Sequence, residues 1–186
     1  MYLYINPLLP DIQITLLEKN IPKKTIQIPK GNDFDSFPET IIEILENENI
    51  EEIWTLLGPG AFTRMRIITL TLGSLHLTKK INIKGTHFFD LISKDIPIIQ
   101  ANTEEYRIKI NNEDILTKKQ DLSLGKYRGY GIKNDFTEGK VFIEYSEDWD
   151  EIYTFFTKLS TKTELTPIYI KSPHITTGLK KKMSPS

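Results

Sequence analysis

Several common sequence features are missing from this chain of 186 residues. It contains no cysteine, which excludes disulfide bonds and thiolate metal sites and fits a reducing compartment. No apolar run approaches the length of a membrane span, and no signal peptide opens the chain. The formal charge is −1 and the pI is near 6.3, so there is no overall basic field to attract nucleic acid. We therefore expect a cytoplasmic protein that does not enter a membrane.

The motifs of common enzyme classes are also missing. The three histidines, His76, His87 and His174, lack a metal-ligand spacing such as HExxH. There is no Gly-x-Ser-x-Gly elbow, nucleotide P-loop or full GxGxxG. A Ser/His/Asp triad stays open, because its members need not be adjacent in sequence. The sequence predicts no catalytic residue and no metal site.

One stretch, residues 53–77, organises the rest of the chain. Its apolar start, residues 53–57, is bounded by glycine and proline and is typical of a buried strand. Gly58-Pro59-Gly60 then ends the strand. The following residues change to the period of a helix of about four turns. A strand, a glycine turn and a helix are predicted.

The predicted helix has two apolar sides instead of the single one that a surface helix needs. The broader side holds Phe62, Met65, Ile68, Leu72 and Leu75, and the narrower side holds Ile67, Leu70 and Leu77. Such a helix is covered twice, either within its own fold or between its fold and a partner. Periodicity does not say which side meets which neighbour.

The glycine turn before this helix also has two interpretations. A glycine loop at a helix N-terminus presents free N–H groups to an anion. Alternatively, the turn is a tight connection with no ligand. In both cases we expect Gly60 to need a backbone conformation that only glycine adopts easily.

The remaining sequence predicts two α/β lobes. Strands are expected at 2–5, 12–17, 24–28, 53–57, 81–83, 97–101, 106–110 and 140–144, and an extended segment at 167–171. Helices are expected from a capping box at Ser36, after Gly85, and over residues 147–159. Residues 111–130 are polar and ambiguous. The division is an N-terminal lobe (1–95), a shortened C-terminal lobe (96–178) and a basic disordered tail (179–186).

The turn and helix start carry a resemblance to a known family. GPGAFTRMRI resembles the GPGSFTGVRIG signature of the bacterial TsaB family, also called YeaZ. The matching residues are Gly58, Pro59, Gly60, Phe62, Thr63, Arg66 and Ile67. Arg64 replaces a glycine of the signature. Near the other end, TPIYIK resembles the terminal PxYLR of the family.

The resemblance implies the two-lobed, ribonuclease H-like fold of the actin, hexokinase and Hsp70 group, with mixed sheets and here a truncated second lobe. The family has an Asp-Thr pair after its first strand, where this chain has Asn6-Pro7. In phosphate-binding members of the fold, an acidic residue there orients Mg²⁺. Its replacement argues against phosphotransfer.

The family function implied is that of a non-catalytic subunit supporting TsaD, which transfers threonylcarbamoyl to a tRNA adenosine. A TsaE-like ATPase joins the assembly, and tRNA contact is indirect. The candidate partner interface comprises Phe37, Ile41, Phe62, Met65, Ile68, Leu72 and Leu75. No cofactor is expected, although a nucleotide at the interface stays open. A self-dimerising module and a small kinase or peptidase of the same fold are the alternatives.

Overall fold

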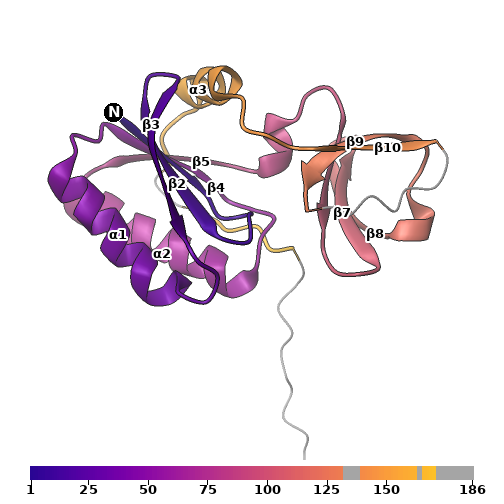
Figure 1. Cartoon of the computed structure of the whole chain (residues 1–186), viewed down its shortest axis with the longest axis horizontal. Helices are drawn as coiled ribbons and strands as arrows, with labels where there is room; N and C mark the ends of the chain where they lie inside the picture. Colours follow the sequence, from indigo (N-terminus) through magenta and orange to yellow (C-terminus); the bar gives the residue numbers. More distant parts are fainter. Residues whose placement is uncertain (132–138, 163–164, 171–186) are drawn as a thin grey trace, which may run out of the picture.

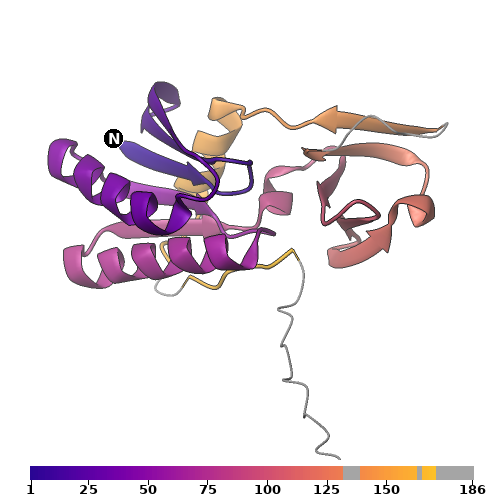
Figure 2. The same ribbon diagram turned by 60° about the horizontal axis from the view of Figure 1, so that its bottom comes forward.

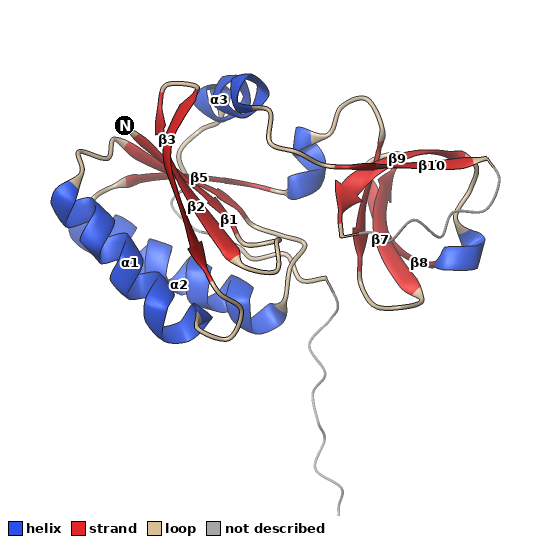
Figure 3. Cartoon of the chain, viewed as in Figure 1, coloured by secondary structure: helices blue, strands red, loops and turns tan. Residues whose placement is uncertain are grey.

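The computed structural model describes residues 1–131, 139–162 and 165–170. The chain forms two five-stranded sheets, and the three α-helices lie around the first sheet (Figures 1 and 3). Each sheet mixes parallel and antiparallel pairs. The expected two-lobed α/β fold with a small second lobe is therefore confirmed. No helix in these ranges is long and apolar enough to cross a membrane.

The first sheet is built from the N-terminal half of the chain. Its strands are β1 (Tyr2–Asn6), β2 (Ile12–Glu18), β3 (Ile21–Ile28), β4 (Glu52–Leu56) and β5 (Asn82–Thr86), in the order β3-β2-β1-β4-β5. The first three strands form an antiparallel meander, and β4 and β5 add parallel to β1. The carboxyl ends of β1, β4 and β5 consequently meet at one edge of the sheet.

Helices cover both faces of this sheet. Figure 2 shows α1 (Asp33–Asn47) and α2 (Phe62–Lys79) side by side on one face, while α3 (Trp149–Lys158) lies on the other face in Figure 1. Alternation along β1 explains both layers: Leu3 belongs to the cluster beneath α1 and α2, and Tyr4 to the cluster beneath α3. Trp54 stacks on Phe156 of α3 with ring centroids 5.3 Å apart. The first sheet is therefore the centre of a three-layer unit.

The second sheet has no α-helix packed on it within the described ranges. It consists of β6 (Ile96–Gln100), β7 (Glu105–Ile110), β8 (Glu113–Lys118), β9 (Gly125–Tyr130) and β10 (Lys140–Glu144), in the order β10-β9-β6-β7-β8. The short 3₁₀ helix η2 (Lys119–Asp121) leads into Leu122, which joins its small apolar core. That core also contains Ile98, Tyr106, Ile108 and Tyr127.

Two predicted helix starts are wrong. Helix α1 begins at Asp33 after Asn32, and no side chain caps it, so Ser36 lies inside the helix instead of forming a capping box. After Gly85, strand β5 continues through Thr86, and only the four-residue 3₁₀ helix η1 (Phe88–Leu91) follows. Pairing with β4 extends β5 over Lys84 and Gly85, which have little strand propensity of their own.

Helix α3 also differs from its predicted place in the second lobe, since it packs on the first sheet through Phe156 and Ile152. The ambiguous residues 111–130 hold β8 and β9. The predicted tail, residues 179–186, lies outside the described residues. The boundaries of independently folding units stay a prediction.

Candidate partner-binding surface and cleft

The glycine turn is held by the C-terminal segment. The Gly60 N–H donates to the carbonyl oxygen of Ile168 (3.1 Å), and the Ile170 N–H donates to the carbonyl oxygen of Gly60 (3.0 Å). Tyr169 forms a parallel bridge to the same glycine. The Gly60 amide is therefore not free to bind an anion.

The glycine that needs its special conformation is Gly58, not Gly60 as expected. Gly58 has φ +125°, and a Cβ there would overlap the carbonyl oxygen of Ile168. Gly60 has no positive φ, but a Cβ would come 2.6 Å from the Met65 Sδ. A side chain at position 60 would therefore have to displace the Met65 side chain.

Helix α2 starts at Phe62, directly after the turn, and its two apolar sides differ in burial. Leu72 is fully buried against the first sheet. Leu70 is 64% exposed and Leu77 is 79% exposed. These two residues are two helical turns apart and so lie on one side. The third residue of the narrower side, Ile67, is half-buried against the core. Leu70 and Leu77 are therefore the exposed part of the narrower side, while the broader side covers the sheet.

This outcome corrects the predicted partner interface. Phe37, Ile41, Met65, Ile68, Leu72 and Leu75 are all buried within the chain's own core. Phe62 is half-buried, with its ring 4.6 Å from that of Tyr169 and beneath the Arg66 guanidinium. Of the predicted set, only Phe62 reaches the surface. We define the outer face of α2 by Arg66, Leu70, Gly73 and Leu77.

Helix α1 lies beside α2 in the same layer, and the outer sides of the two helices differ in charge. Its sequence has five acidic residues and no Lys or Arg. Glu39, Glu43 and Glu46 are exposed, and Ile42 between them is 44% exposed. Helix α2 has no acidic residue and exposes Arg66 and Lys79. The two-helix layer is thus acidic over α1 and apolar to basic over α2.

Between the two sheets lies a cleft of about 980 Å³ at the carboxyl ends of β1 and β4. Asn6 sits beside it, where the resemblance places a carboxylate in related proteins. The Asn6 Nδ2 atom donates to the Tyr130 hydroxyl (2.8 Å) and to Glu147 (2.8 Å), and its Oδ1 accepts from the Leu8 N–H (3.1 Å). The Nδ2 atom therefore joins the two sheets through Tyr130, and the Oδ1 atom holds the loop that follows β1.

Tyr130 acts as a neutral hydroxyl in this network. Burial, with a smaller contribution from the nearby Tyr4, raises the pKa of Tyr130 far above its usual range. Its hydroxyl accepts from Asn6 and donates to Glu147 at 3.1 Å. Sequence patterns do not indicate this link, because Asn6 lies more than a hundred residues from both partners along the chain.

Arg64 fixes the loop between β1 and β2 beside the cleft. Its guanidinium is buried and donates to the carbonyl oxygens of Leu9 (2.6 Å), Pro10 (2.8 Å) and Pro7 (3.3 Å). Arginine presents several donors in one plane, which suits three neighbouring carbonyls. The replacement of a signature glycine by Arg64 was the one sequence signal for this clamp.

A second set of charged contacts joins the sheets near η1. The His87 Nε2 lies 3.0 Å from Asp114 on β8, and its Nδ1 accepts from the Phe89 N–H (3.0 Å). Both ring nitrogens are thus engaged, which leaves neither to act as a general base. Burial acts to raise the pKa of Asp114, but hydrogen bonds from His87 and Arg107 outweigh it and lower this pKa.

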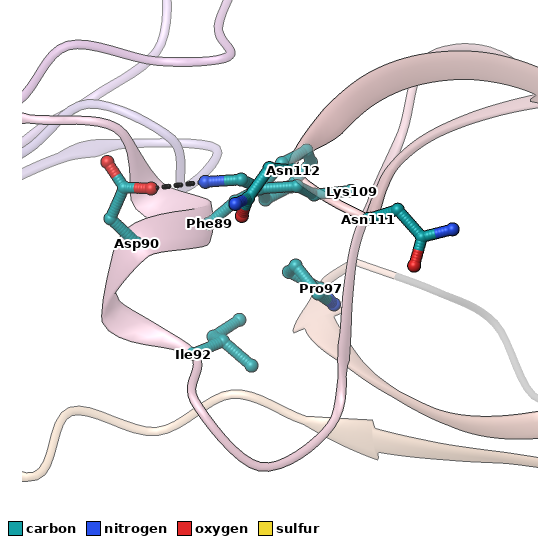
Figure 4. Close-up of a pocket in the computed structure, with 7 residues that line it drawn as sticks. All are labelled: Phe89, Asp90, Ile92, Pro97, Lys109, Asn111 and Asn112. Carbon is teal, nitrogen blue, oxygen red and sulfur yellow. Dashed lines mark hydrogen bonds and ion pairs between the residues drawn. The ribbon is translucent and has the colours of Figure 1, made fainter.

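The same junction contains a pocket of about 500 Å³ (Figure 4). Its wall carries the ion pair between Lys109 and Asp90, at 2.6 Å. Ile92 after η1, and Pro97 and the turn residue Asn112 of the second sheet, complete it. Since each of its two charges neutralises the other, the pocket offers no net charge to a ligand. In the described ranges no group of three His, Asp or Glu residues could hold a metal ion.

Comparison with solved structures finds YeaZ from Pseudomonas aeruginosa, with a TM-score of 0.64, 12% identity, and coverage of 90% of this chain and 98% of that chain. A second match is an uncharacterized Pseudomonas aeruginosa protein with similarity to peptidase YEAZ (TM-score 0.47, 14% identity, coverage 69% and 74%). No family model and no curated protein matches the sequence. This chain therefore has the YeaZ fold.

Proposed function

We propose that this chain is a non-catalytic, TsaB-type subunit that binds a TsaD-like threonylcarbamoyltransferase through the outer surface of α1 and α2. The observation that carries the proposal is the exposure of Leu70 and Leu77 on a helix whose other apolar side is already buried. Apolar side chains aligned on one exposed side are typical of a protein interface. The complex formed would serve tRNA threonylcarbamoyladenosine synthesis, with a TsaE-like ATPase as a further component.

The contact between the two family-like motifs supports this assignment. The GPG turn and the TPIYIK segment lie more than a hundred residues apart in the sequence, yet Ile168 and Ile170 hydrogen-bond to Gly60. Phe62 at the start of α2 also contacts Tyr169. Both motifs therefore serve one structural purpose, which is to position the first turn of α2.

The non-catalytic role is supported by the cleft. Asn6 has its amide engaged in hydrogen bonds and brings no carboxylate to the place where related phosphotransferases orient Mg²⁺. His87, beside Asp114, has both nitrogens occupied. We therefore expect no ATPase, kinase or peptidase activity from the isolated chain.

The test uses the purified TsaD-type subunit from the same cell and measures its affinity for three forms of this chain by calorimetry. Leu77→Asp should weaken binding at least about 30-fold, since charge in an interface core costs about 2 kcal/mol or more. The control is Leu124→Asp. Leu124 is 74% exposed, close to the 79% of Leu77, but it lies in the second lobe, directly before β9.

Two results would refute the proposal. One is that the unmodified chain does not bind at a concentration of about 100 µM, which is 100 times a typical micromolar Kd. The other is that Leu77→Asp and Leu124→Asp lose affinity equally. If the unmodified chain does not bind the TsaD-type subunit but forms a dimer, and Leu77→Asp makes it monomeric, the self-dimerising alternative is established.

A further inference from the structure

The two sheets have four edge strands, and three of them carry features that discourage pairing with another chain. Strand β3 contains Pro22, which has no N–H, and a register shift interrupts its pairing with β2. Strand β5 is covered at Ile83, whose carbonyl oxygen accepts from the Lys162 N–H at 2.8 Å. In β8, charged or polar residues occupy four of the six positions. The fourth edge, β10, differs because its sequence is KVFIE, with three apolar residues between two charges.

The free edge of β10 presents the backbone groups of alternate residues. The Tyr145 N–H donates to the Gly129 carbonyl oxygen, and the Gly139 carbonyl oxygen accepts from the Gly125 N–H. Residues 139 and 145 thus direct their backbone groups toward β9. Because these groups alternate in side along a strand, residues 140, 142 and 144 direct theirs away from β9. Figure 2 shows β10 as the orange strand along the outer edge of the second sheet.

The sequence of β10 is complementary to its own reverse. When an identical strand lies antiparallel with Phe142 opposite Phe142, Lys140 lies opposite Glu144 at both ends of the contact. The same register matches residues 140, 142 and 144 with one another as hydrogen-bonded pairs. On the other face, Val141, which is 56% exposed, lies opposite Ile143. Charge and backbone geometry therefore favour one register, and it is a symmetric one.

The end charges of β10 are available for this contact. Within the described ranges neither Lys140 nor Glu144 forms an ion pair, and Glu144 accepts a hydrogen bond from the Gly131 N–H at 3.1 Å. On β8, by contrast, the Asp114 carboxylate is already paired with His87 and Arg107. A strand of another protein would need the same charges in reverse order, whereas a second copy of this chain supplies them by symmetry.

We propose that β10 is a dimerisation edge, where it pairs antiparallel with β10 of a second copy and Lys140 of each copy pairs with Glu144 of the other. The dimer contains one continuous sheet with five strands from each copy. This contact is distinct from the outer surface of α1 and α2, which the proposed function assigns to the TsaD-type subunit, and it goes beyond that function.

The test is a charge exchange measured by analytical ultracentrifugation between about 1 and 100 µM. The unmodified chain should dimerise. Lys140→Glu opposes two pairs of glutamates and Glu144→Lys opposes two pairs of lysines, so each variant alone should weaken the dimer about tenfold or more. An equimolar mixture of the two variants should dimerise again, because every opposed pair then joins Glu to Lys. This recovery also shows that both variants are folded.

Further variants locate the contact. Val141→Lys should weaken the dimer at least about tenfold, because it sets a charge among apolar side chains of the interface. The matched control is Leu116→Lys on β8, at the opposite edge of the same sheet, where Leu116 is 46% exposed; it should leave the dimer unchanged.

Four results would overturn the inference. They are a monomeric chain at about 100 µM, a mixture that dimerises no better than its two components, dissociation by Leu116→Lys, and dissociation by Leu77→Asp. The third would assign the dimer to β8 and the fourth to the outer face of α2. None of these measurements involves the TsaD-type subunit, so the proposed function is tested separately.

Discussion

The two sheets share one strand order but differ in their connections. The orders β3-β2-β1-β4-β5 and β8-β7-β6-β9-β10 are the same arrangement, with three antiparallel strands followed by two parallel ones. In the first sheet, α1 and α2 provide the connections into β4 and β5. In the second, residues 119–124 with the short η2 provide the connection into β9. Strand pairing therefore fixes the topology, and the connections decide what each lobe presents.

This difference explains why the candidate surface lies on the first lobe alone. A helical connection buries one side on the sheet and leaves another side for a partner. Among the described residues, α1 and α2 form such connections, and α3 packs on the opposite face of the same sheet. The second sheet's core is closed by Leu122 and neighbouring strand residues, so that no helix layer is available there. Its contribution is to hold the cleft and the C-terminal segment in place.

The largest expected effect tests which side of α2 belongs to the first sheet. Leu72→Asp should unfold the chain, because it buries an unpaired carboxylate at a cost of about 4 kcal/mol or more. Leu70→Asp should change the free energy of unfolding by less than about 0.5 kcal/mol. Urea titration followed by circular dichroism separates them. Equal unfolding by both variants would show that α2 is buried on all sides.

A second comparison asks whether α3 supports the first sheet. Phe156→Ala should destabilise the protein by about 3–5 kcal/mol and change the fluorescence of Trp54, on which its ring stacks. Ile108→Ala, in the small core of the second sheet, should cost less, about 2–4 kcal/mol, and leave Trp54 fluorescence unchanged until unfolding. If Ile108→Ala alters the Trp54 signal in the folded state, the two cores are not separate.

Sequence patterns predicted the strands and helices that are mostly buried. Periodicity placed β1, β2, β4 and α2 to within a few residues, because each has a strong apolar pattern. It failed for β8, whose residues are almost all exposed, since an edge strand with polar side chains has no alternation to detect. Such strands are defined by pairing with a neighbour and not by their own composition.

The candidate surface was only half predictable. The sequence shows two apolar sides on α2, but it does not show which of them covers the sheet. The predicted interface was placed on the broader side, which is buried. The amide of Asn6 could be identified as a departure, yet its bonds to Tyr130 and Glu147 arise from tertiary structure. Gly73 interrupts the pattern of α2 in the sequence, and the structure adds that no described residue lies within 4 Å of where its Cβ would be.

The link between the two sheets at Asn6 gives a smaller expected effect. Asn6→Asp would remove a donor and set a carboxylate against Glu147, whose Oε1 now lies 2.8 Å from the Asn6 Nδ2. We expect a loss of about 1–3 kcal/mol at pH 7. Two carboxylates at this distance raise each other's pKa, so the loss should diminish as the pH falls and one of them takes up a proton. Chemical unfolding between pH 7.5 and 4.5 checks this, with exposed Asn112→Asp as control. A loss that does not depend on pH would contradict the contact.

The smallest effect concerns Asp114, which links β8 to His87 of the first lobe at 3.0 Å and to Arg107 at 2.6 Å. Its pKa is lower in the folded protein than the ordinary value of 3.8. Stability from this carboxylate is therefore present above about pH 4 and is lost as the pH falls through the lower folded pKa. Asp114→Asn should cost about 0.5–1 kcal/mol at pH 7, because the pair is partly exposed to solvent screening. It should also remove this part of the decline in unfolding free energy below pH 4. Exposed Glu113→Gln is the control for a general charge effect. If both variants flatten the acid decline equally, the contact with His87 and Arg107 contributes nothing specific, and the second sheet is held to the first mainly through Asn6 and the C-terminal segment.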